Sequence, residues 1–80
     1  MPYITRDARE ALTRRVAENP GELNYEITTL LRSYQFKKGL NYQTINDILG
    51  ALEASKTEFY RRVVIPYETS KIAENGDVYL

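Results

Sequence analysis

The 80-residue sequence contains no cysteine and no histidine. Without cysteine there are no disulfide bonds and no thiolate nucleophiles, and without either residue the usual ligands of zinc are missing. The absence of histidine also removes the side chain that most often acts as a general base near neutral pH. We therefore expect a protein that is not an enzyme and that needs no cofactor and no metal.

The chain also lacks a net charge. Eleven Lys and Arg residues balance eleven Asp and Glu residues, so the formal net charge at pH 7 is +0. A balanced chain creates no overall field that would attract nucleic acid or an anionic membrane. We expect no nucleic-acid partner and no membrane partner, and any site for an anion has to be local.

Long apolar runs are missing as well. No stretch approaches the roughly 20 residues that a helix needs to cross a bilayer, and the N-terminus lacks the basic-then-apolar layout of a secretion signal. The default expectation is a cytoplasmic protein. The length predicts a single domain over 1–80, and a chain of this size buries only about 60% of its unfolded surface. Such a marginal core favours a homo-oligomer.

Apolar residues at helical spacing predict an all-α protein of three to four helices in a small bundle. Thr5 can cap a first helix over 6–18, which has a thin apolar stripe. The second helix should run from Pro20 to about Lys38, because Asn19 can cap it and Gly39 can end it. Its core-facing stripe consists of Leu23, Ile27, Leu30, Leu31 and Tyr34.

A second strip lies on the opposite side of this helix, at about 100° per residue. It consists of Tyr25, Thr29, Arg32 and Phe36. The core stripe cannot also bury this partly aromatic strip. We therefore expect it to form an interface with a partner.

A third helix is predicted over 42–64, capped by Asn41. Its stripe consists of Ile45, Ile48, Leu49, Leu52, Phe59 and Val63. Because Pro66 cannot continue a helix with normal hydrogen bonds, we expect a break or kink near Ile65 and a short helix over 67–74. The last residues, 77–80, alternate polar and apolar and could pair with 2–4 as a two-stranded ribbon.

Basic and aromatic side chains gather near this proline and are the candidate ligand-binding residues. Tyr60, Arg61, Arg62 and Tyr67 combine bidentate donors with aromatic faces, a combination that suits a phosphate or a nucleobase. Adjacent arginines point about 100° apart on a helix, so at most one would face a given pocket unless a second subunit closes it. Simple solvation of both arginines is the alternative.

Three further residues join the candidate ligand site. Lys56 falls near the centre of the third helix's apolar stripe, where it either faces an anionic ligand or reaches solvent over an aliphatic stem. Tyr42 and Asn46 belong to a polar helix start whose N–H groups favour an anion, although capping and solvation explain most of it. The carboxylates of the third helix do not repeat as paired acidic motifs, so we expect no metal-dependent catalysis.

Five motifs spread over 21–79 are GELNY, YQTINDI followed by GALE, EFYRRVV, PYE and ENGDVY. Together they resemble a family of short phage and prophage proteins of unassigned function. The resemblance implies a viral or mobile-element origin and a small all-helical domain, and it brings no catalytic assignment. Small phage proteins without catalytic residues often act against host systems by binding a host protein or by sequestering a nucleotide signal. Applying this to the present chain is an analogy based on a shared phage origin, and no residue carries it.

The leading functional hypothesis is a homo-oligomer whose tyrosine-lined interfaces hold a small anionic ligand, nucleotide-derived, of a host defence system. Sequestration requires tight binding and no turnover, which suits a chain without the usual nucleophiles and bases. The alternative is a protein-interaction module that uses the strip on the second helix against a host or phage protein. A nucleotide hydrolase built on carboxylates and a divalent cation is a third interpretation.

Overall fold

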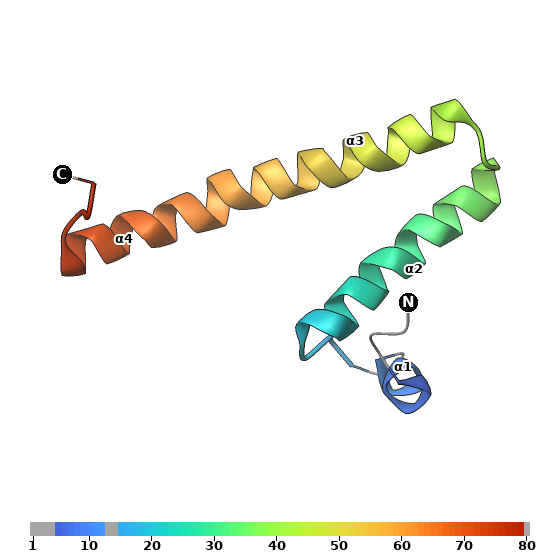
Figure 1. Ribbon diagram of the computed structural model, residues 1–80, viewed down its shortest axis with the longest axis horizontal. Helices are drawn as coiled ribbons and strands as arrows, with labels where there is room; N and C mark the ends of the chain where they lie inside the picture. The colour runs from blue at the N-terminus through green and yellow to red at the C-terminus, as the bar shows by residue number, and fades with distance from the viewer. Residues whose placement is uncertain (1–4, 13–14, 80) are drawn as a thin grey trace. The chain divides into compact units, whose positions relative to one another are not determined.

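A computed structural model describes residues 5–12 and 15–79, and the regular elements of this part of the chain are all helical (Figure 1). They are α1 (Arg6–Leu12), α2 (Pro20–Lys38), α3 (Tyr42–Phe59), a π-helical turn η1 (Tyr60–Val64) and α4 (Ile65–Asn75). The predicted all-α class is confirmed. The chain divides into two compact units, Met1–Ile45 and Asn46–Leu80, and the single-domain assignment stays a prediction.

The first helix begins where the sequence predicts and ends earlier. The Thr5 hydroxyl accepts a hydrogen bond from the Ala8 backbone N–H at 3.1 Å, so the predicted cap is confirmed. The helix ends at Leu12, and residues 15–18 are not helical, so the prediction of a helix to residue 18 was wrong. Helix α1 packs on α2, where Leu12 is 8% exposed.

A long-range ion pair explains why the chain leaves the helix. The Arg15 guanidinium donates to both carboxylate oxygens of Glu22, at 2.7 and 2.8 Å. The same carboxylate accepts a hydrogen bond from the Glu18 backbone N–H at 3.0 Å, and this N–H is not engaged in a helix. These contacts hold the 15–18 segment in a loop against the first turn of α2.

Helix α2 has the predicted bounds because both of its ends carry local signals. Asn19 has extended backbone angles, and its side chain accepts a hydrogen bond from the Glu22 N–H at 2.9 Å, with Pro20 opening the helix. Gly39 ends the helix at φ 87° and ψ 161°, and its N–H donates to the Gln35 carbonyl at 2.7 Å. These angles belong to a region that is essentially restricted to glycine.

The turn that follows Gly39 delivers the chain into α3. The Asn41 side chain accepts a hydrogen bond from the Thr44 backbone N–H at 2.9 Å, so the predicted cap of the third helix is confirmed. Thr44 is 2% exposed and is the most buried residue among those described. The conformation of this turn is stabilised by its own cap, the hydrogen bond between the Thr44 N–H and the Asn41 side chain.

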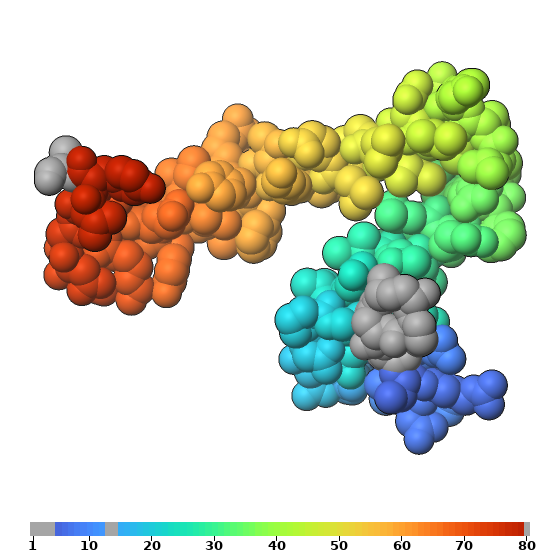
Figure 2. Space-filling view, in the orientation of Figure 1, coloured from blue at the N-terminus to red at the C-terminus, as the bar shows by residue number. Residues whose placement is uncertain are grey.

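In the second unit, α3 runs through η1 into α4 without interruption (Figure 1). Residues 46–75 therefore form one helical rod. The sequence predicted a break or kink near Ile65; the helix is not interrupted there, and the irregularity takes the form of the π turn that ends at Val64. In the space-filling view the yellow-to-orange part of this rod is one helix thick (Figure 2). Consistent with this, side chains of the predicted apolar stripe remain open: Leu49 is 60% exposed, Phe59 60% and Val63 49%.

The π turn allows the helix to continue through Pro66. In an α-helix the proline ring would collide with the carbonyl of the residue four positions earlier, Arg62, and could not donate a hydrogen bond to it. In η1 the bonding steps back by five residues, and the Ile65 N–H reaches the Tyr60 carbonyl. One extra residue in the turn removes the collision, so that the helix continues.

The helical rod ends at Gly76, with φ 86° and an N–H that donates to the Ile72 carbonyl at 2.8 Å. Residues 77–79 then form a turn in which the Asp77 carboxylate accepts from the Tyr79 N–H at 2.9 Å, and not the extended strand predicted for them. The other half of the expected ribbon, residues 2–4, lies outside the described residues. No helix within the described ranges is long and apolar enough to cross a membrane.

Candidate functional site

The π turn η1 organises the basic and aromatic residues that the sequence singled out. Short π-helical segments inside α-helices occur frequently at functional sites. Here the segment carries Tyr60, Arg61 and Arg62 and is followed at once by Pro66 and Tyr67. We call Glu58, Tyr60, Arg61, Arg62, Tyr67 and Glu68 the π-turn cluster.

Both arginines of the cluster bind the same carboxylate. Arg61 Nη2 donates to the two Glu58 oxygens, at 2.9 and 3.2 Å, and Arg62 Nη1 lies 3.7 Å from Glu58 Oε1. The sequence predicted that at most one of two adjacent arginines could face a given pocket unless a second subunit closed it. Within one chain both guanidinium groups reach Glu58, which lies three and four residues before them, and guanidinium groups are suited to bind a phosphate or carboxylate.

The aromatic members of the cluster also have polar partners. The Tyr60 hydroxyl donates to Glu68 Oε1 at 3.5 Å, across the π turn. The Lys71 ammonium lies 5.5 Å from the centroid of the Tyr67 ring, and it pairs with Glu74 at 3.2 Å. Lys71 therefore already occupies one face of the Tyr67 ring, and a nucleobase would stack on the other face or replace this contact.

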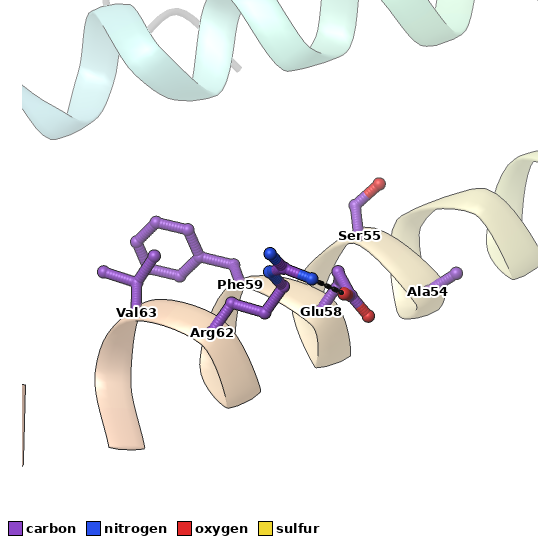
Figure 3. A pocket seen from close by; sticks show the side chains of 6 residues that line it. All are labelled: Ala54, Ser55, Glu58, Phe59, Arg62 and Val63. Carbon is purple, nitrogen blue, oxygen red and sulfur yellow. Dashed lines mark ion pairs between the residues drawn. The ribbon is translucent and has the colours of Figure 1, made fainter. Parts of the chain in front are cut away.

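An open depression in the surface adjoins the cluster (Figure 3). It is lined by Ala54, Ser55, Glu58, Phe59, Arg62 and Val63. Figure 3 shows the Arg62 guanidinium directed toward the Glu58 carboxylate, with Phe59 and Val63 supplying the apolar side. All six residues come from one stretch of helix, so the depression is a face of the rod and lacks opposite walls.

Charge at the cluster is balanced. Arg61 and Arg62 are the cations, Glu58 and Glu68 are the anions, and all four side chains are exposed. An anionic ligand would have to displace Glu58 from the two guanidinium groups. The sequence spacing was enough to indicate this competition, because Glu58 lies three residues before Arg61 and four before Arg62, and residues at those intervals are neighbours on a helix.

The remaining predicted ligand residues lie elsewhere on the helix. Lys56 is exposed on α3, one turn before the cluster. Asn46 is exposed near the beginning of the second unit, and Tyr42 is exposed at the first position of α3 in the other unit. Tyr60, Arg61, Arg62 and Tyr67 therefore fall in one stretch of helix, and the structure does not place Tyr42 or Asn46 with them.

The predicted interface strip on α2 is also only partly continuous. Phe36 is 76% exposed, and the Arg32 guanidinium lies 5.1 Å from the centroid of its ring. The Thr29 hydroxyl donates to the carbonyl of Tyr25 at 3.0 Å, and Tyr25 itself is half-buried. The free part of the strip is thus the Arg32 and Phe36 end.

Sequence reasoning missed the most strongly paired ionisable group, Glu22. Its hydrogen bonds to Arg15, to the Glu18 N–H and its proximity to the Asn19 cap lower the pKa of Glu22 to about 2. The bond to Glu22 in turn raises the pKa of Arg15. A signal was present, because Asn19 and Glu22 have the spacing of a capping box, in which the acidic residue reaches back across the helix start.

In the described part of the chain, no group of three or more Asp, Glu, His or Cys side chains is placed to hold a metal ion. Comparison with curated proteins gives no match, and comparison with solved structures gives none either. A family profile does match, over residues 1–78. The chain belongs to the family described as domain of unknown function DUF6899.

Proposed function

We propose that this chain is a non-enzymatic binding protein that holds a small anionic ligand, nucleotide-derived, at the π-turn cluster and works as a homo-oligomer. The observation that carries the proposal is the convergence of Arg61 and Arg62 on one carboxylate, at 2.9 and 3.7 Å. Glu58 occupies the place that a phosphate oxygen of the ligand would take. Tyr60 and Tyr67 lie on the same stretch and supply rings on which a base can stack.

The proposed biological role is sequestration of a nucleotide signal of a host defence system by a phage-type protein. The motifs over 21–79 support the phage or mobile-element origin by resemblance. A sequestering protein needs tight binding and no chemistry, which fits a sequence without cysteine or histidine. Cytoplasmic location follows from the same role, because such signals act inside the host cell.

Titration calorimetry with linear and cyclic nucleotides tests the ligand. We expect heat for at least one phosphate-bearing compound and its loss in both Arg61→Gln and Arg62→Gln. Lys38→Gln is the matched control, because it removes one exposed cation at the end of α2, away from the cluster in sequence. Absence of heat across the whole panel, or equal loss in the control, would contradict the proposal.

The exposed Phe36 with Arg32 beside it favours a second candidate, a protein-interaction module. Arginine and aromatic residues are typical anchors of protein interfaces. This function predicts a stoichiometric protein partner in co-purification from infected cells, lost in Phe36→Ala and retained in Arg61→Gln. The nucleotide proposal predicts the opposite dependence for its ligand.

A further inference from the structure

We infer that the apolar stripe of the helical rod is the contact surface with a second copy of this chain, paired antiparallel about a two-fold axis between Leu52 and Lys56. The inference deepens the homo-oligomer part of the proposed function and does not depend on any ligand. It names the interface residues, the orientation of the two chains and the reason for a cation in the stripe.

The spacing of the stripe is that of a two-helix seam. It consists of Leu49, Leu52, Lys56, Phe59 and Val63, at intervals of three and four residues. Over α3 this is the alternation of a and d positions in a heptad repeat, with Leu49 and Lys56 at a and with Leu52 and Phe59 at d. Val63 lies in the π turn η1, beyond this register. A seam of this width suits one partner helix and is narrower than the face that a globular core covers.

No described element of the second unit packs over the stripe. In the described part of this unit the rod is followed by the turn at 76–79, and the contacts between its elements are those of η1 with the α4 that continues it. The apolar members stay open to solvent: Leu49, Leu52, Phe59 and Val63 are all exposed. Contiguous exposed apolar surface of this kind marks an interaction site.

Lys56 decides the orientation of the partner. In a parallel pair in register, Lys56 would lie directly opposite Lys56 of the partner subunit at an a layer, where two like charges meet. In an antiparallel pair, a positions face d positions. When Leu49 is level with the partner subunit's Phe59, Lys56 is level with the partner subunit's Leu52.

The flanking charges complete this antiparallel arrangement. Glu53 follows Leu52 and lies at an e position, on the same side of the seam as Lys56. The antiparallel register therefore brings Lys56 beside Glu53 of the partner subunit, and the two-fold axis repeats the pair. Two lysines and two glutamates alternate at the centre of the seam, so that a cation in the apolar stripe is matched by opposite charge.

On the other side of the seam, the residue nearest the two-fold axis is small. Ser55 lies at a g position, and g positions of antiparallel helices face each other, so Ser55 would meet its own copy. A small residue there lets the helices approach. Ser55 also offers a place to test the orientation, because the chain has no cysteine of its own.

Sedimentation equilibrium of the full chain without any added ligand tests the association. We expect a dimer, or a multiple of it, for the unmodified chain. Glu53→Lys and Lys56→Glu should each raise the dissociation constant about tenfold or more, because each places like charges at the centre of the seam. Circular dichroism checks that both variants keep their helices.

Mixing the two variants separates an interchain from an intrachain contact. In a mixed dimer the two substituted side chains, one from each variant, face each other with opposite charge. The unchanged Lys56 of one chain still faces the unchanged Glu53 of the other, so an equimolar mixture should recover the affinity of the unmodified chain. A monomeric unmodified chain, or a mixture that associates no better than its components, overturns the inference. The second outcome would show that the chains associate without the contact between Lys56 and the partner subunit's Glu53.

Cross-linking tests the antiparallel orientation. We expect a short bis-maleimide to link Ser55→Cys into a dimer efficiently and Thr57→Cys poorly, since Thr57 lies on the far side of the rod. Equal yields from the two variants overturn the orientation. A dimer with these properties and no calorimetric response to nucleotides would leave this inference standing while removing the ligand part of the proposed function.

Discussion

Arg15 and Glu22 are joined by two parallel hydrogen bonds, from Nη1 to Oε1 at 2.7 Å and from Nη2 to Oε2 at 2.8 Å. The pair spans seven residues and ties the loop after α1 to the first turn of α2. Fork-to-fork pairs of this kind are the geometrically most specific of protein ion pairs. Because Glu22 is only 5% exposed and also accepts the Glu18 N–H, the pair fixes the start of α2 from outside the helix.

Stability of the first unit should therefore depend on pH in acid solution. The pKa of Glu22 falls from an ordinary value of 4.5 to about 2. A lowered pKa in the folded chain contributes stability that is fully present above pH 4.5 and is lost as the pH falls toward 2. We expect the thermal midpoint, followed by circular dichroism, to fall across this range.

Glu22→Gln isolates the contribution of this carboxylate. The variant keeps the side-chain size and loses the charge, so it should be less stable than the unmodified chain at pH 7, and the difference should shrink as the pH approaches 2. Glu74→Gln serves as the control, because Glu74 is an exposed carboxylate of the other unit, paired with Lys71 at 3.2 Å. Parallel pH profiles for the unmodified chain and Glu22→Gln would show that the ion pair is not what holds the loop.

Two glycines should respond in opposite directions to alanine. Gly39 has φ 87° and ψ 161°, so Gly39→Ala should lower the free energy of unfolding by about 1–3 kcal/mol. Gly50 lies inside α3 with nothing within 4 Å of an added Cβ, so Gly50→Ala should raise it by about 1 kcal/mol through helix propensity. Urea unfolding measures both, and a stable Gly39→Ala would contradict the requirement for glycine at the turn.

The bounds of α2 were predictable because the information is local. Asn19 and Pro20 specify the start, and Gly39 specifies the end, through backbone angles and hydrogen bonds within four residues. The caps at Thr5 and Asn41 were predictable for the same reason. Each of these features depends on the intrinsic chemistry of one residue and needs no tertiary contact.

The end of α1 at Leu12 and the continuation of the helix through Pro66 could not be predicted from such local signals. Leu12 ends α1 although Val16 continues the apolar spacing, because the ion pair of Arg15 with Glu22 reaches across seven residues. Proline does interrupt α-helical hydrogen bonding. At Pro66 the helix nevertheless continues, because a π turn, which contains one residue more than an α-helical turn, avoids the collision with the proline ring. The convergence of the two arginines on Glu58 does not need that turn, because residues three and four positions apart are neighbours on a helix surface.

Replacing Pro66 tests whether the π turn builds the cluster. Pro66→Ala restores a backbone N–H, so residues 60–66 can adopt α-helical bonding, and removing the extra residue of the turn rotates Tyr67 relative to Glu58 and Arg61 by up to about 100°. We expect higher thermal stability together with weaker nucleotide binding. Pro20→Ala is the control, because that proline only opens α2. Unchanged nucleotide affinity in Pro66→Ala would separate the π turn from the site.

Removing the carboxylate that occupies the candidate site should strengthen ligand binding. Glu58 holds Arg61 at 2.9 Å and Arg62 at 3.7 Å, and a ligand phosphate has to displace it. Exposed ion pairs contribute about 0.2–1 kcal/mol each. Glu58→Gln frees both guanidinium groups while keeping the side-chain volume, so the dissociation constant for the nucleotide should fall about two- to fivefold at low salt.

Glu18→Gln is the matched control for this experiment, because Glu18 is an exposed carboxylate of the other unit that pairs with Arg15 at 2.7 Å and should leave the affinity unchanged. The sign of the Glu58→Gln effect separates two roles of that carboxylate. If Glu58 competes with the ligand, affinity rises. If Glu58 instead holds the arginines in position for the ligand, affinity falls, and the guanidinium groups of the isolated cluster would then not be a site for an anion on their own.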